Sequence, residues 1–303
     1  MKAMAEYAMR GRFHATALAS LFAMLSLILP PLSYISGALV ALVTMRRGIS
    51  EGAVIAVISA VVLTLVAQLS TGSMVIGFVF AIMVWLPVWI LSIVLRQTVS
   101  MMLTVSVAAL IAAIAVVGFH VMVTDTLSWW LNIIDQLAAS ISKSGGDATH
   151  FEVMRENIAQ FMTGLMATAF FLSMILSLFL GRWWQAILYN PGGFKTEFHA
   201  FRLDKTAAIV GSLILIWASV NSVPGSLAID LSFVVSVFGS VAGLALIHHF
   251  VAVRQMNRAW IITLYLLLMF VAPQLLLILA IVGFADAWLD IRRFYTNKGN
   301  GSV

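Results

Sequence analysis

The stretch that decides the fold runs from Ile35 to Leu69 and reads ISGALVALVTMRRGISEGAVIAVISAVVLTLVAQL. Two apolar segments meet in it at a basic corner, Arg46-Arg47-Gly48. The arginines suit the negative dipole end of the first helix, and Gly48 permits the left-handed backbone that stops a helix. Ser50 is a good cap for the next helix, and Glu51 suits its positive end. The stretch therefore predicts two membrane-spanning helices joined by a short charged turn.

The composition of the whole chain agrees with a membrane protein. The 303 residues are 62% hydrophobic and 10% charged, and the mean hydropathy is +1.05. Soluble domains carry about 25% charged residues, and several runs here exceed the roughly 18 uncharged residues that mark a spanning helix. Because the runs do not alternate in polarity as the strands of a barrel do, the predicted class is all-α, a polytopic transmembrane helical bundle.

The basic charge of the chain indicates a lipid bilayer as its partner, not a nucleic acid. The net charge is +5, but the Lys and Arg residues fall between the apolar runs, as the positive-inside rule requires. Lys2, Arg10 and Arg12 precede the first run, which has no small-residue cleavage site. An uncleaved first helix with a cytoplasmic N-terminus is therefore expected.

The pattern of apolar runs predicts about 8–10 spans in a single integral membrane domain, residues 1–303. Residues 13–123 form an N-terminal five-span part, 124–156 an extracytoplasmic segment, and 157–303 the C-terminal spans and a short tail. The first span is expected to stop at Pro30-Pro31, and Pro87 to kink the fourth. Apolar residues at helical spacing around Trp129 and Trp130 predict an amphipathic helix in the outer segment. Gly145-Gly146 would end that helix, and Thr149 would start the sixth span.

The last apolar run, 259–288, has two interpretations. As one helix it leaves the basic tail outside the cell. If Pro273 breaks it into a hairpin, the basic tail returns to the cytoplasmic side. In that case Lys143 and Arg155 are the only Lys and Arg residues that lie outside the cell. The hairpin is the preferred prediction because it satisfies the positive-inside rule.

Small residues on the first helix form a candidate docking face. Gly11, Ala15 and Ala19 lie four apart, and this spacing lets another helix approach closely. The face either packs inside the bundle or docks a partner membrane subunit. A similar face of serines and glycines between Ser232 and Gly243 is expected to serve packing alone.

A possible solute pocket is predicted at the outer ends of the spans. Its candidate residues are polar or aromatic, and they are Gln68, His120, Asp125, Trp129 and Trp130. Ionisable groups inside a membrane are functional candidates by default. For His120, Asp125 and Asp230, however, simple reach to the membrane interface is the plainer interpretation.

Catalytic and metal-binding patterns are missing from the sequence. There is no HExxH, GxSxG or Walker A motif, and the adjacent His248 and His249 point to different faces of a helix. With no cysteine in the chain, thiol chemistry and disulfides are excluded. We therefore expect no enzyme activity, no cofactor and no metal.

The C-terminal stretch from Gly283 to Arg293 combines acidic, basic and aromatic residues. Asp286 and Asp290 share a helix face. Asp290 is expected to meet Arg293, and Asp286 to meet an arginine from another loop. The stretch is either a helix end anchored by Trp288 or a contact to a partner.

Two of these stretches resemble a known family. The Arg46-Arg47-Gly48 corner and the ending Gly283, Asp286, Trp288, Asp290 and Arg292 are similar to YybS-like bacterial membrane proteins, which are uncharacterised. That family is distantly similar to the S components of energy-coupling-factor vitamin transporters, which dock through an Ala-x-x-x-Ala pattern. Ala15 and Ala19 match this pattern, but the chain departs from it in its extra C-terminal spans and long outer segment.

The resemblance implies a multi-pass protein of the bacterial inner membrane with an S-component-like N-terminal part. One implied function is a solute-capturing transport subunit that needs another membrane subunit for energy. The alternative is a membrane scaffold or envelope-biogenesis protein, because the rod-shape scaffold protein MreD has been viewed as another distant relative. Transport predicts a polar cavity of roughly 300–1,000 Å³, whereas scaffolding predicts a filled bundle with an exposed interface.

Overall fold

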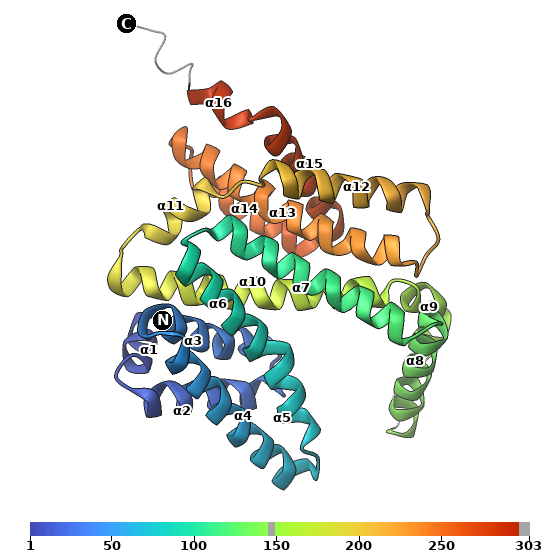
Figure 1. Cartoon of the computed structure of the whole chain (residues 1–303). Helices are drawn as coiled ribbons and strands as arrows, with labels where there is room; N and C mark the ends of the chain where they lie inside the picture. The colour runs from blue at the N-terminus through green and yellow to red at the C-terminus, as the bar shows by residue number, and fades with distance from the viewer. Residues whose placement is uncertain (145–148, 297–303) are drawn as a thin grey trace, which may run out of the picture. The chain divides into compact units, whose positions relative to one another are not determined.

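Helices joined by short turns make up the computed structural model of the chain, which describes residues 1–144 and 149–296 (Figure 1). Within those residues there is no strand, and the predicted all-α bundle is confirmed. The elements are α1 (Lys2–Ala8), α2 (Arg12–Ser26), α3 (Leu32–Arg47), α4 (Ile49–Thr71), α5 (Val75–Phe80), the π-helix η1 (Ala81–Trp85), α6 (Leu86–Thr98), α7 (Met101–Met122), α8 (Thr126–Lys143), α9 (Thr149–Ala159), α10 (Met162–Tyr189), α11 (Gly193–Ala200), α12 (Lys205–Val220), α13 (Leu227–Val253), α14 (Ala259–Phe270), α15 (Ala272–Leu289) and α16 (Ile291–Thr296).

Six helical segments of the described chain are long and apolar enough to cross a membrane. They are α4, the continuous run α5–η1–α6, α7, α10, α13 and α15. The pair α11 and α12, bent by 56°, would make a seventh. The sequence predicts more spans because it includes α2 and α3, which have only 15 and 16 residues. The break at Pro30-Pro31 and the corner at Gly48 limit their lengths.

The described chain forms two compact units, and each is best considered by itself. Unit 1 contains residues 1–108 and 170–201, and unit 2 contains residues 109–169 and 202–303. These boundaries differ from the sequence division at residues 123 and 156, because α7 and α10 each contribute to both units.

Unit 1 is built around α3, which packs against α2, α4 and α6 (Figure 1). Its interior is rich in small side chains, and Ala15, Ala19 and Ala23 of α2 are fully buried. Trp85 donates from Nε1 to Ser36 Oγ at 3.0 Å and so ties η1 to α3. The wide turn of η1 comes directly before Pro87, where a proline ring disturbs regular helix bonding. The predicted Pro87 kink is thus a π-helical turn.

The basic corner is confirmed as the junction of two helices. Gly48 has a φ of +129° and is the only residue between α3 and α4. Ser50 lies inside α4 and does not cap it, so that part of the prediction was wrong: the helix begins one residue before it. Arg96 of α6 donates to the carbonyl of Met45 at 2.7 Å. This bond satisfies one of the carbonyls that a helix end leaves open.

Unit 2 is built around the close approach of α13 and α15. A Cβ atom added to Gly243 would lie 2.0 Å from the carbonyl oxygen of Leu279, and one added to Gly283 would lie 2.1 Å from that of Gly239. Only glycine permits backbones to approach this closely. The small face of α13 therefore serves packing, as the sequence predicts.

The last apolar run folds back on itself. Arg202, just before α12, lies 2.5 Å from Asp290, just after α15. Because α12 and α13 are joined by the turn at residues 221–226, α13 ends where α12 begins. A single helix over residues 259–288 would carry Asp290 to the opposite end. The chain must therefore reverse at Val271, between α14 and α15, which supports the predicted hairpin.

The sixth span starts later than the sequence indicates. Helix α9 begins at Thr149, but it ends at Ala159, and α10 begins at Met162. The expectation of one continuous helix was wrong, since Gln160 and Phe161 separate two helices. The predicted stop at Gly145-Gly146 lies outside the described residues.

The glycine contact between α13 and α15 gives a first test. Replacing Gly243 or Gly283 by alanine should destabilise the protein by about 1–3 kcal/mol, because the added methyl group overlaps the facing backbone. Thermal unfolding of the purified protein in detergent would measure the loss. Gly118→Ala is the matched control, since a Cβ there meets nothing within 4 Å. A Gly243→Ala variant as stable as Gly118→Ala would contradict the packing.

Candidate functional site

A buried carboxylate, Asp230, forms the centre of the candidate site in unit 2. Its side chain has no exposed surface, although it lies in the first turn of α13. The oxygen Oδ2 lies 2.8 Å from His120 Nε2 of α7, and Oδ1 accepts a hydrogen bond of 3.0 Å from the backbone amide of Gly164. The expectation that Asp230 simply reaches the interface was therefore wrong.

Helix ends supply the electrostatics of this pair. Asp230 lies at the positive end of α13, and Gly164 offers one of the amides that the first turn of α10 leaves unpaired. His120 lies in the last turn of α7, where a helix dipole favours a positive charge. The ends of α7, α10 and α13 therefore meet at this pair, and each contributes either a residue or a backbone donor to it.

The amphipathic helix α8 connects to the same place through its tryptophans. Trp130 donates from Nε1 to Thr163 Oγ1 at 2.8 Å, and Thr163 is next to Gly164. Phe119, next to His120, lies edge-on to Trp129 with ring centroids 5.1 Å apart. Helix α8 therefore contacts α7, which carries His120, and α10, whose Gly164 amide bonds Asp230.

This arrangement suits recognition of a proton or a small polar solute. The side chain of His120 is 17% exposed, whereas that of Asp230 is fully buried. The imidazole is therefore the group that a solute can reach, and the carboxylate orients it. Within residues 1–144 and 149–296, no three His, Asp or Glu side chains gather closely enough to hold a metal ion.

The structure brings together part of the predicted pocket. His120, Trp129 and Trp130 belong to the site just described. Asp125 instead caps α8, accepting bonds from the amide of Ser128 at 2.9 Å and from its hydroxyl at 2.6 Å. Gln68 lies in unit 1, half-buried near the end of α4. Asp230, Gly164 and Thr163 also belong to this site and were missed as site residues.

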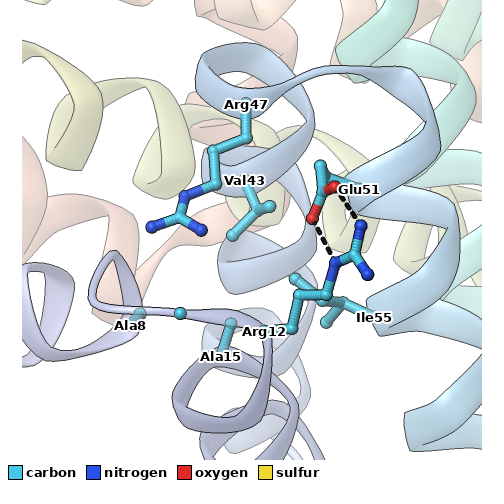
Figure 2. Close-up of a pocket in the computed structure, with 8 residues that line it drawn as sticks. Ala8, Arg12, Ala15, Val43, Arg47, Glu51 and Ile55 are labelled. Atoms are coloured by element: carbon cyan, nitrogen blue, oxygen red, sulfur yellow. Dashed lines mark hydrogen bonds and ion pairs between the residues drawn. The ribbon is translucent and has the colours of Figure 1, made fainter.

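The predicted docking face is used inside unit 1. Ala15 and Ala19 are only 1% and 0% exposed. Their burial favours packing over docking at these two positions. Gly11 and Ala15 line a notch with Arg12, Arg47 and Glu51 (Figure 2). Arg12 closes this notch with two hydrogen bonds to Glu51, of 2.8 and 2.5 Å. The space left inside does not admit water, so no solute site is formed there.

The C-terminal motif is a set of internal contacts of unit 2, with partners different from those predicted. Asp286 is buried and pairs with Arg292 of its own segment at 2.9 Å, while Asp290 pairs with Arg202 of another loop. Arg292 takes the place of the expected arginine from another loop at Asp286 because Asp290 takes a left-handed φ of +50°. That turn brings Arg292 back toward Asp286. Gly283 packs on α13, and Trp288 is exposed.

The cap of α8 gives a prediction about pH. The hydrogen bonds from Ser128 lower the pKa of Asp125 below its usual value. A lowered pKa in the folded state means that the cap stabilises α8 above the unfolded pKa of about 3.9 and is lost as the pH falls through the folded value. The protection of the amides at the start of α8, taken as the intrinsic exchange rate at each pH divided by the observed rate, should therefore fall below about pH 4.

Variants of the cap separate charge from hydrogen bonding. Asp125→Asn keeps a good capping side chain and should make this protection independent of pH, whereas Asp125→Ala should lower the protection at every pH. The same loss of protection below about pH 4 in the native protein and in Asp125→Asn would contradict the role of Asp125.

Comparison with known protein families places most of the chain in a match to one family model. The model of a protein family described as "Predicted membrane protein (DUF2232)" matches residues 17–287, a range that includes most of both units. No curated protein and no solved structure matches the chain. With the six apolar helices, this match supports a multi-pass membrane location.

Proposed function

The chain belongs to the DUF2232 family of predicted membrane proteins, and on that premise we propose that it is a membrane subunit that captures a small polar solute. The observation that carries the proposal is the fully buried Asp230 carboxylate, which holds the partly exposed imidazole of His120. Burying an ionisable group among apolar helices is costly. Such a pair is retained where its charge or its proton is used.

In this proposal, His120 contacts the solute and Asp230 positions the imidazole. Helix α8 acts as the cover, because Trp129 and Trp130 contact the residues next to His120 and Gly164. Besides these contacts to α7 and α10, α8 is joined to α9 by the Asp135–Arg155 ion pair at 2.9 Å, so in this proposal α8 and α9 move together.

Membrane sidedness is part of the proposal. We place the protein in the bacterial inner membrane, with the N-terminus and the Arg46-Arg47 corner in the cytoplasm and α8 outside, as the positive-inside rule favours. Since the chain has no cysteine, single cysteines at Ser50 and Ser142, both exposed, report the two sides cleanly. An impermeant thiol reagent added outside intact cells should label Ser142→Cys and leave Ser50→Cys unlabelled. The reverse result would overturn this orientation.

Capture alone does not move a solute, so the proposal includes a partner subunit that supplies energy and no enzyme activity in this chain. The likeness to YybS-like proteins and S components motivates it. Because Ala15 and Ala19 are buried, the partner would dock on another surface. The alternative is a membrane scaffold or envelope-biogenesis protein acting through helix–helix contacts, and such contacts too would have to use a surface other than the buried alanines of α2.

Native mass spectrometry of the protein purified from its own membranes tests solute capture. The native chain should carry a small-molecule adduct, and His120→Gln and Asp230→Asn should each lose it. Truncating one partner of a buried charged pair costs about 2–5 kcal/mol, which is a loss of at least about 30-fold in affinity. Asp125→Asn, a nearby carboxylate outside the pair, should keep the adduct.

The same preparation distinguishes the two function classes. Co-purification of an ATPase partner supports energised transport. Solute capture would be refuted if Asp230→Asn retained the adduct. It would also be refuted if the native chain carried no adduct and co-purified with envelope proteins. Thermal unfolding confirms that each variant is folded, and the amide of Asp230→Asn can still accept the bond from Gly164.

A further inference from the structure

The net positive charge of the protein comes from one unit alone. Unit 1 contains eight Lys and Arg residues and three Glu residues, whereas unit 2 contains nine residues of each sign. The whole net charge of +5 is therefore carried by unit 1. Such an asymmetry points to an anionic partner for that unit.

The carboxylates of unit 1 are already engaged. Glu6 pairs with Lys2, Glu51 with Arg12, and Glu197 with Arg182. The remaining cations of this unit thus have no carboxylate of their own unit left to neutralise them. They are Arg10, Arg46, Arg47, Arg96 and Lys195, all exposed.

A groove in the side of unit 1 begins near one of these cations. It has a volume of about 300 Å³ and lies between α4 and the η1–α6 segment. Its lining is apolar and consists of Ala53, Ala56, Val57, Ala60, Ala81, Ile82, Trp85, Leu86 and Trp89. The indole of Trp89 donates to the carbonyl of Ile49 at 3.0 Å. This bond ties the end of the groove to the first residue of α4, next to the basic corner.

Arg96 lies beyond that end of the groove, about 10 Å farther along α6 than Trp89. It follows Trp89 by seven residues on α6, which places both on the same face of the helix. One guanidinium nitrogen, NH1, bonds the carbonyls of Met45 and Thr44. Since a guanidinium carries five N–H donors, Arg96 retains donors for an anion.

We propose that this groove is a binding site for an anionic phospholipid. The headgroup phosphate pairs with Arg96 at the membrane surface, and an acyl chain lies in the groove. From Ala53 to Ala60 the groove follows α4 for about 10 Å, within the roughly 15 Å of one hydrocarbon leaflet. A phospholipid supplies both the anion and the apolar chain that the two halves of the site require.

A lipid accounts for both halves better than a partner helix does. A helix with side chains is about 10 Å wide, too wide to enter a groove of this volume. An apolar helix would also leave Arg96 without a counter-ion. This inference is independent of the solute site in unit 2.

Photo-crosslinking of the purified full chain in nanodiscs tests the proposal. The probe is a phosphatidylglycerol with a diazirine in one acyl chain, compared with a phosphatidylcholine carrying the same group. Labelled peptides identified by mass spectrometry should map to residues 53–60 and 81–89. Labelling by phosphatidylglycerol should exceed labelling by phosphatidylcholine about fivefold, because one cation near anionic lipid is worth about 1 kcal/mol.

Two variants and a control complete the test. Arg96→Gln should remove the preference for phosphatidylglycerol, and Ala56→Phe should fill the groove and reduce labelling by both lipids. Arg10→Gln removes an exposed arginine that lies over Tyr7 and should change neither result. Equal labelling by the two lipids, or an unchanged preference in Arg96→Gln, would overturn the proposal. So would full labelling of folded Ala56→Phe.

Discussion

Close contact between helix backbones is the interaction on which both units depend. Lipid is as apolar as the side chains of this protein, so burial from water does not drive its helices together. Van der Waals contact must do so, and it is strongest where side chains are smallest. In unit 1 the alanines of α2 provide such a face against α3, and in unit 2 Gly239, Gly243 and Gly283 bring α13 and α15 together.

Polar groups are placed where this packing leaves helix ends. Asp230, His120 and Gly164 all lie in terminal turns of their helices, where unpaired amides and helix dipoles offset part of the cost of charge. Arg96 similarly bonds the carbonyls at the end of α3. The site in unit 2 differs from these structural bonds in that its carboxylate is fully buried while its partner stays accessible.

The sequence was sufficient for the class of fold and for its local corners, but not for its long-range pairs. Apolar runs and the Arg46-Arg47-Gly48 junction follow from local patterns, and so does the reversal before Pro273. The bond between His120 and Asp230 joins positions 110 residues apart, which no periodicity reveals. Nothing in the sequence around Gly164 indicated that its backbone amide would bond Asp230. The pair of Asp286 with Arg292 depends on the left-handed backbone of Asp290, a conformation that aspartate seldom adopts.

The packing of α13 on α15 also bears on synthesis of the chain. Helix α13 enters the membrane before α14 and α15 have been made. Its glycine face is therefore uncovered at that stage. The pairs of Arg202 with Asp290 and of Arg292 with Asp286 involve almost the last described residues. Unit 2 can therefore be completed only after residues 286–292 have been translated. Until then an insertase or a neighbouring helix must shield the glycine face of α13 that α15 later covers.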